Sequence, residues 1–181
     1  MTEQKQNHIF LKKLVYSAMF LSIALLLPFL TGQIQSFGAA LCPMHIPVLL
    51  CGFICGAQYG AIVGFTAPLM RHFIFHMPVF WSALPMAFEL AVYGLCAGIL
   101  YKLLPKKPLY IYVSLISSMI AGRLCWGAVS FVISGLRSTE FNFNIFWLAS
   151  VAQSVPGIIL QIILIPIIVM ALKRAKLALN E

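Results

Sequence analysis

The sequence predicts an all-α fold, a polytopic membrane protein in which residues 1–181 form one compact bundle of six transmembrane helices. The first observation is composition: 62% of the residues are hydrophobic and 9% are charged, whereas a soluble globular domain carries about 25% charged residues. The second is a series of apolar stretches long enough to cross a hydrocarbon core of about 30 Å. The third is the placement of the basic residues in the segments between those stretches, which is typical of membrane topology signals. The net charge of +8 therefore does not indicate nucleic-acid binding.

The apolar stretches define each expected span in order. The first follows Lys12 and Lys13 and lacks a small-x-small cleavage site directly after it, so we interpret it as a retained span rather than a signal peptide. A polar loop, 31–43, separates it from the next apolar stretch. The fourth span ends at the basic turn 105–108, and the sixth contains Pro156 and Pro166, which we expect to kink it. The expected spans are 14–30, 44–56, 59–76, 82–104, 109–134 and 145–172.

The count of six depends on whether the stretch 46–75 crosses once or twice. Two crossings place nine of the twelve basic residues on one face of the membrane, and one crossing loses this bias. We therefore expect a tight cytoplasmic turn at Gly56–Gly60, cytoplasmic termini, and Arg137 in a loop on the other face. The nine residues are Lys5, Lys12, Lys13, Lys102, Lys106, Lys107, Lys173, Arg174 and Lys176.

Glycines recur at every fourth position of this helix pair, at Gly52, Gly56, Gly60 and Gly64. Small residues at that spacing let two helices approach closely, and we favour an intramolecular hairpin over a dimer face. The five cysteines include no CxxC pair. Cys51 and Cys55 lie one helical turn apart, but apolar packing is the usual role of buried thiols, so no metal site and no cofactor are predicted.

Three charged residues lie inside the expected spans: Arg71, Glu89 and Arg123. Each costs about 2.5–3.5 kcal/mol at the centre of a membrane helix unless it is paired or faces a cavity. Their positions along the helices place all three between the midplane and the outer leaflet, so we expect one cluster that opens outward. Two Arg against one Glu leave a surplus positive charge, which favours an anionic ligand group such as a carboxylate. A purely structural Glu89–Arg123 pair is the alternative.

Other polar and aromatic residues reach the same level of the membrane. Trp81 and Trp147 are more typical of an interface belt than of ligand contacts. On the first span, Ala18 and Ser22 form a ridge of small residues suited to helix packing or to a partner. No HExxH, GxSxG or P-loop motif is present, and catalysis is not predicted. The further candidate binding residues are His72, Trp126, Asn142, Asn144 and Gln153.

Four segments carry a resemblance to a known family. They are Met44–Gly52, Tyr59–Gly64, Ala87–Ala91 and Gly122–Gly127. In this order they resemble the substrate-binding S component of an energy-coupling factor (ECF) vitamin transporter, and the resemblance covers nearly the whole chain.

The resemblance implies a mechanism as well as a fold. Such a subunit binds a vitamin at the outer face of a bacterial plasma membrane, then docks on a membrane T component driven by two cytoplasmic ATPase subunits. The family's docking motif, AxxxA, falls on Ala18 and Ser22, with Ser in place of the second Ala. The loop 31–43 would be a lid, with Gln33 and Gln35 as ligand contacts.

The surplus Arg favours a carboxylate vitamin, with pantothenate first because it is small and anionic, and folate or biotin next. Two other classes stay open. One is a scaffold or assembly subunit of a membrane complex, in which the intramembrane charges only pair helices. The other is a self-sufficient permease or channel, although we detect no internal repeat of the kind that alternating access commonly uses.

Overall fold

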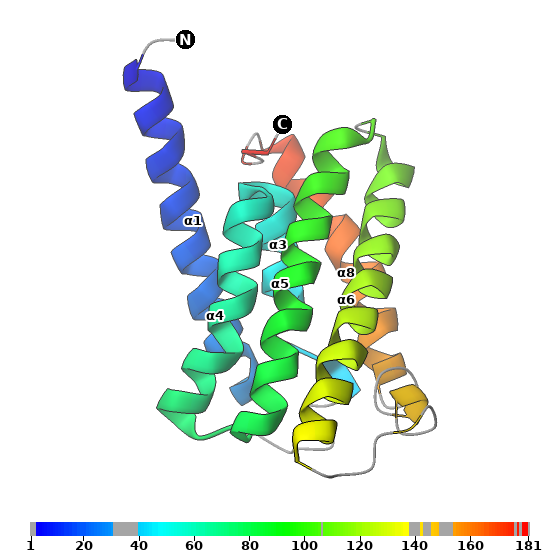
Figure 1. Cartoon of the computed structure of the whole chain (residues 1–181). Helices are drawn as coiled ribbons and strands as arrows, with labels where there is room; N and C mark the ends of the chain where they lie inside the picture. Colours follow the sequence, from blue (N-terminus) through cyan, green and yellow to red (C-terminus); the bar gives the residue numbers. More distant parts are fainter. Residues whose placement is uncertain are drawn as a thin grey trace.

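Six helices carry the fold of the residues described by this computed structural model, which are 3–30, 40–105, 107–137, 142, 146–148, 154–175, 177 and 179–180. Consecutive helices run in alternate directions along a bundle, and both termini lie at the same end (Figure 1). The helices are α1 (Glu3–Leu30), α3 (His45–Cys55), α4 (Ala57–Phe75), α5 (Phe80–Leu103), α6 (Pro108–Leu136) and α8 (Val155–Arg174).

The centre of the bundle is α3, which contacts α1, α4, α5 and α8. Every residue of this helix is buried, which its sequence allows because it contains no Asp, Glu, Lys or Arg. Its 11 residues rise about 16 Å, half the thickness of a hydrocarbon core. The helix is therefore a core element enclosed by longer helices.

Four helices, α1, α5, α6 and α8, are long and apolar enough to cross a membrane. The chain is thus a multi-pass, all-α membrane protein. The shorter α3 and the more polar α4, which carries Arg71 and His72, fall outside that group. Six full spans, and the side of the membrane on which each terminus lies, stay predictions.

The hairpin of α3 and α4 is confirmed, but the turn is shorter than expected. Gly56 alone joins the two helices, with a φ of 104° that suits glycine. Gly60, expected in the turn, lies inside α4 against Gly52, where a Cβ would come 2.7 Å from the Gly52 Cα. Gly94 of α5 packs on both. Three helix backbones therefore cross without intervening side chains, as small residues permit.

The final helix begins later than expected. The predicted span starts at residue 145, whereas α8 begins at Val155. Pro156 stands in the first turn, where its missing N–H costs no helical hydrogen bond. Its expected role as an internal kink is therefore wrong, and Pro166 is the proline inside the helix.

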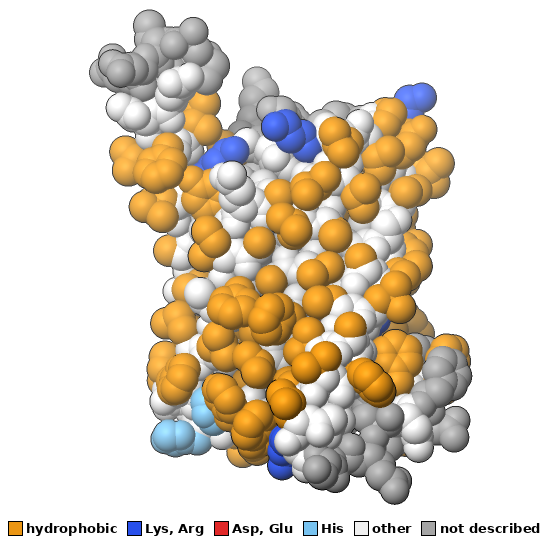
Figure 2. All heavy atoms as spheres, in the orientation of Figure 1, with side chains coloured by type: hydrophobic (Ala, Val, Ile, Leu, Met, Phe, Trp, Pro, Cys, Tyr) orange, Lys and Arg blue, Asp and Glu red, His pale blue; other side chains and the backbone are white. Residues whose placement is uncertain are grey.

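The exterior of the bundle is apolar, as expected for a lipid-facing surface. Figure 2 shows hydrophobic side chains over the visible face, with Lys and Arg gathered at the end that carries the termini. Lys102 ends α5, Lys107 precedes α6, and Lys173 and Arg174 end α8, all at this end of the bundle (Figure 1). Arg137 follows α6 at the other end. The predicted sorting of these charges by end is confirmed for the described residues.

Candidate functional site

A buried ion pair joins α5 to α6. Arg123 Nη1 lies 3.0 Å from Glu89 Oε1, and the Glu89 side chain is 3% exposed while that of Arg123 is 16% exposed. The sequence offered this pair as the alternative to a cluster of three charges, and the pair is present in the structure. An unpaired carboxylate or guanidinium inside the membrane would cost several kcal/mol. Pairing lowers this cost, so each of the two residues explains why the other is tolerated.

Two residues that the sequence did not single out as binding residues complete this cluster. His45, the first residue of α3, places Nε2 3.6 Å from Glu89 Oε1. Its ring meets the Tyr93 ring edge-on, with centroids 5.2 Å apart. Tyr93 stands one turn after Glu89 on α5, a spacing that puts both on one helix face, and this was the signal available in the sequence. Gly122 leaves room for the Tyr93 ring beside Arg123.

Two buried polar atoms of the cluster, the His45 Nδ1 and the Arg123 Nε, make no hydrogen bond among the described residues. The Tyr93 hydroxyl and the His45 Nε2 both face the Glu89 carboxylate. Buried polar atoms in native proteins are nearly always satisfied by protein, water or ligand. The two atoms are enclosed by the bundle beside the ion pair.

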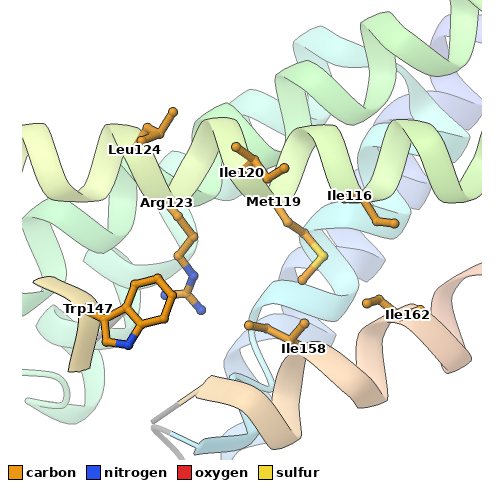
Figure 3. A pocket seen from close by; sticks show the side chains of 8 residues that line it. All are labelled: Ile116, Met119, Ile120, Arg123, Leu124, Trp147, Ile158 and Ile162. Carbon is orange, nitrogen blue, oxygen red and sulfur yellow. The ribbon is translucent and has the colours of Figure 1, made fainter. Parts of the chain in front are cut away.

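Arg123 connects the cluster to a cavity of about 370 Å³ between α6 and α8. Figure 3 shows its side chain extending from α6 into this space, with the Trp147 indole beside it. Arg123 is the one charged residue among the described residues that line the cavity, Glu89 does not line it, and the lining surface is almost entirely apolar. Trp147, expected in the interface belt, is 55% exposed and also lines this cavity. The lining residues are Ile116, Met119, Ile120, Arg123, Leu124, Trp147, Ile158 and Ile162.

Cys42 lies on the other side of the Arg123 guanidinium, with Sγ 3.9 Å from Nη2. Burial raises the pKa of the Cys42 thiol above its ordinary value. The thiol is therefore neutral at pH 7 and does not compete with Glu89 as the counter-charge of Arg123.

Arg71 does not join this cluster. Its Nη1 donates a 2.7 Å hydrogen bond to the Leu25 carbonyl of α1, and its guanidinium lies 5.0 Å from the centroid of the Phe29 ring and 5.6 Å from that of Phe75. The prediction of one cluster of three charges is therefore wrong. The depth of a residue in a helix is set by its number, but the neighbour that it faces depends on how the helices pack, and α4 turns Arg71 toward α1.

The other predicted residues take varied positions. His72 Nδ1 lies 2.8 Å from the Pro78 carbonyl, which ties it to the turn between α4 and α5 and not to Glu89. Trp126 packs on Phe146 at 6.2 Å between centroids, and Asn142 is exposed, its carbonyl accepting the Phe146 N–H. Gln33, Gln35, Asn144 and Gln153 lie outside the described residues.

The ridge of small residues on α1 is accessible. Ala18 and Ser22 are both exposed, and the Ser22 hydroxyl donates to the Ala18 carbonyl at 3.0 Å, within its own helix. This bond satisfies the hydroxyl. Of the four long apolar helices, α1 is the least buried, so its exposed face is available to lipid or to another protein.

Fold and site together define a class: a multi-pass membrane protein with a buried ion pair beside an apolar cavity. The family model for the ECF transporter substrate-specific component matches residues 12–170. The chain belongs to this family, and it is a substrate-specific subunit of an ECF importer, not an enzyme. A search of curated proteins and a search of solved structures found no significant match.

Proposed function

We propose that this subunit captures a small carboxylate vitamin at Arg123, in the cavity between α6 and α8, and that pantothenate is the vitamin. One observation carries the proposal: Arg123 lines the cavity while its partner Glu89 is buried behind it. On this proposal the ligand reaches the guanidinium, which belongs to the one charged residue among the described lining residues, and a guanidinium binds a carboxylate with two parallel hydrogen bonds.

The surplus of two Arg over one Glu does not support a carboxylate ligand in the structure, because Arg71 is bound to α1 and lies outside the cluster. The Glu89–Arg123 pair is neutral overall. We infer the charge of the ligand from which residue of the pair lines the cavity, and that residue is Arg123. The Arg123 Nε is buried and makes no hydrogen bond among the described residues, whereas its Nη1 pairs with Glu89.

The size of the cavity favours a small vitamin. Ligand sites are commonly about 300–1,000 Å³, and a cavity of about 370 Å³ is near the lower limit. Pantothenate suits this volume better than folate, which carries a fused ring system and a glutamate. Biotin, with one carboxylate, is the next choice.

We further propose that loading is followed by docking on a T component with two cytoplasmic ATPase subunits. The exposed Ala18 and Ser22 of α1 support this, since small residues allow close helix contact. The proposal places the termini in the cytoplasm of a bacterial cell, with six crossings and the loop 31–43 as an outer lid. Co-purification of a T component and ATPases with the tagged chain tests it, and a bulky Ala18→Trp variant should lose them.

Isothermal titration of the purified protein against pantothenate, biotin, folate, riboflavin and thiamine tests the ligand. The account expects saturable binding of pantothenate at a ratio of one to one. Preferential binding of the cationic thiamine would contradict the polarity argument. Binding of no vitamin, with ATPases still co-purifying, would favour the scaffold alternative.

A further inference from the structure

A second groove lies on the lipid-facing side of the bundle, between α5 and α6, away from the Arg123 cavity. Its volume is about 430 Å³, and its lining is apolar throughout. Leu84 and Phe88 line it from α5, and Val132, Ile133 and Leu136 line it from α6. Figure 2 shows hydrophobic side chains over the visible face of these two helices. The groove offers no polar group to a soluble ligand but does offer a channel to an acyl chain.

A cation stands at one end of this groove. Arg137 directly follows Leu136, and its guanidinium lies 4.9 Å from the centroid of the Trp81 ring, one turn before Leu84 on α5. Arg137 is exposed, and Glu89, the acidic residue whose side chain the structure describes, pairs with Arg123 and not with Arg137. The contact with Trp81 holds the guanidinium beside the start of α5, and Arg137 is the residue after Leu136, which lines the groove.

The length of α6 places this cation at the level of lipid phosphates. The helix has 29 residues and rises about 43 Å, close to the 40–45 Å of a bilayer with its headgroups. Lys107 at one end and Arg137 at the other therefore both reach headgroup depth. Trp81 suits the same interface, where tryptophan is enriched.

We propose that this face binds one anionic phospholipid, with an acyl chain in the groove between α5 and α6 and its phosphate at Arg137. The site is separate from the vitamin site and does not depend on it. Its ligand is a membrane lipid and not a free phosphate, because the apolar groove is the larger part of the surface.

Native mass spectrometry of the full chain in detergent, titrated with phosphatidylglycerol, tests the proposal. We expect a one-lipid adduct that Arg137→Gln weakens about fivefold, the effect of one basic residue near an anionic lipid surface. Ala128→Trp, which fills the groove from α6, should weaken it without changing any charge. Lys107→Gln removes the same charge from the other end of α6 and should leave the adduct unchanged.

Three outcomes would overturn the proposal. Equal loss in Arg137→Gln and Lys107→Gln would show unspecific attraction between charges. Equal binding of glycerol phosphate and phosphatidylglycerol would show that the groove holds no chain. A dimer mass that Ala128→Trp abolishes, with no lipid adduct, would assign the groove to a second copy of the chain.

Discussion

Neutralising the Glu89–Arg123 pair one residue at a time separates a binding role from a structural one. In Arg123→Gln the Glu89 carboxylate, 3% exposed, stays buried without its partner, and breaking a buried pair in this way costs about 3–5 kcal/mol of folding free energy. We expect the lower limit, about 3 kcal/mol, because the 16% exposure of Arg123 lets water reach the remaining carboxylate. The Glu89→Gln/Arg123→Gln double variant leaves no buried charge and should recover most of this loss.

Ligand binding should follow a different pattern from stability. Arg123→Gln and the double variant should both lose pantothenate binding, because each lacks the guanidinium. Glu89→Gln should bind at least as tightly as wild type, since its Arg123 no longer shares its donors with a carboxylate. The assays are the thermal unfolding midpoint in detergent and isothermal titration.

Two results would refute the reasoning. If the double variant binds as tightly as wild type, the pair only holds α5 to α6 and the ligand binds elsewhere. If Glu89→Gln loses binding as fully as Arg123→Gln while keeping its stability, the ligand contacts the carboxylate, and the proposed polarity toward the cavity is wrong.

The remaining predictions concern packing and the role of Arg71. Gly94→Ala places a Cβ against the Gly60 carbonyl, so it should lower the free energy of unfolding by about 1–3 kcal/mol or more and reduce the unfolding midpoint and the folded yield. Gly135→Ala is the control, because nothing lies within 4 Å of its added Cβ. Equal effects of the two variants would contradict the glycine crossing. Asn180→Ala removes the hydrogen bonds that the side-chain amide donates to the Gly52 and Gly98 carbonyls, and the free energy of unfolding should fall by about 1 kcal/mol. An unchanged midpoint in thermal unfolding would show that these hydrogen bonds contribute nothing. Arg71→Gln removes contacts between α4 and α1 and should speed hydrogen exchange in α1 while titration gives an unchanged Kd; a loss of affinity would return Arg71 to the ligand site.

Composition and charge placement predicted the class of fold because they reflect the solvent. A chain with 9% charged residues cannot cover a water-facing surface, and the apolar exterior follows (Figure 2). The glycine spacing predicted the hairpin for a similar reason, since backbones approach closely only where side chains are absent. The turn was placed less well, because a glycine in a turn and a glycine at a helix crossing look alike in sequence.

The candidate site was predicted in part. Charge in an apolar helix needs a partner, and this argument paired Glu89 with Arg123 correctly. It did not show which way Arg71 faces, because an arginine finds a carbonyl or an aromatic ring as readily as a cavity. His45 and Tyr93 were not predicted, because a neutral histidine or tyrosine in a membrane helix carries no charge that needs a partner.

The central claim, that the vitamin binds beside Arg123 between α6 and α8, is tested most directly by the fluorescence of single-tryptophan variants. The chain has three tryptophans, of which Trp147 lines the cavity and Trp81 packs against Arg137. Replacing the other two by Phe leaves one reporter at a time. The account predicts that pantothenate shifts the emission of Trp147 in a saturable way and leaves that of Trp81 unchanged. A vitamin that calorimetry shows to bind, but that leaves Trp147 unchanged, would contradict it.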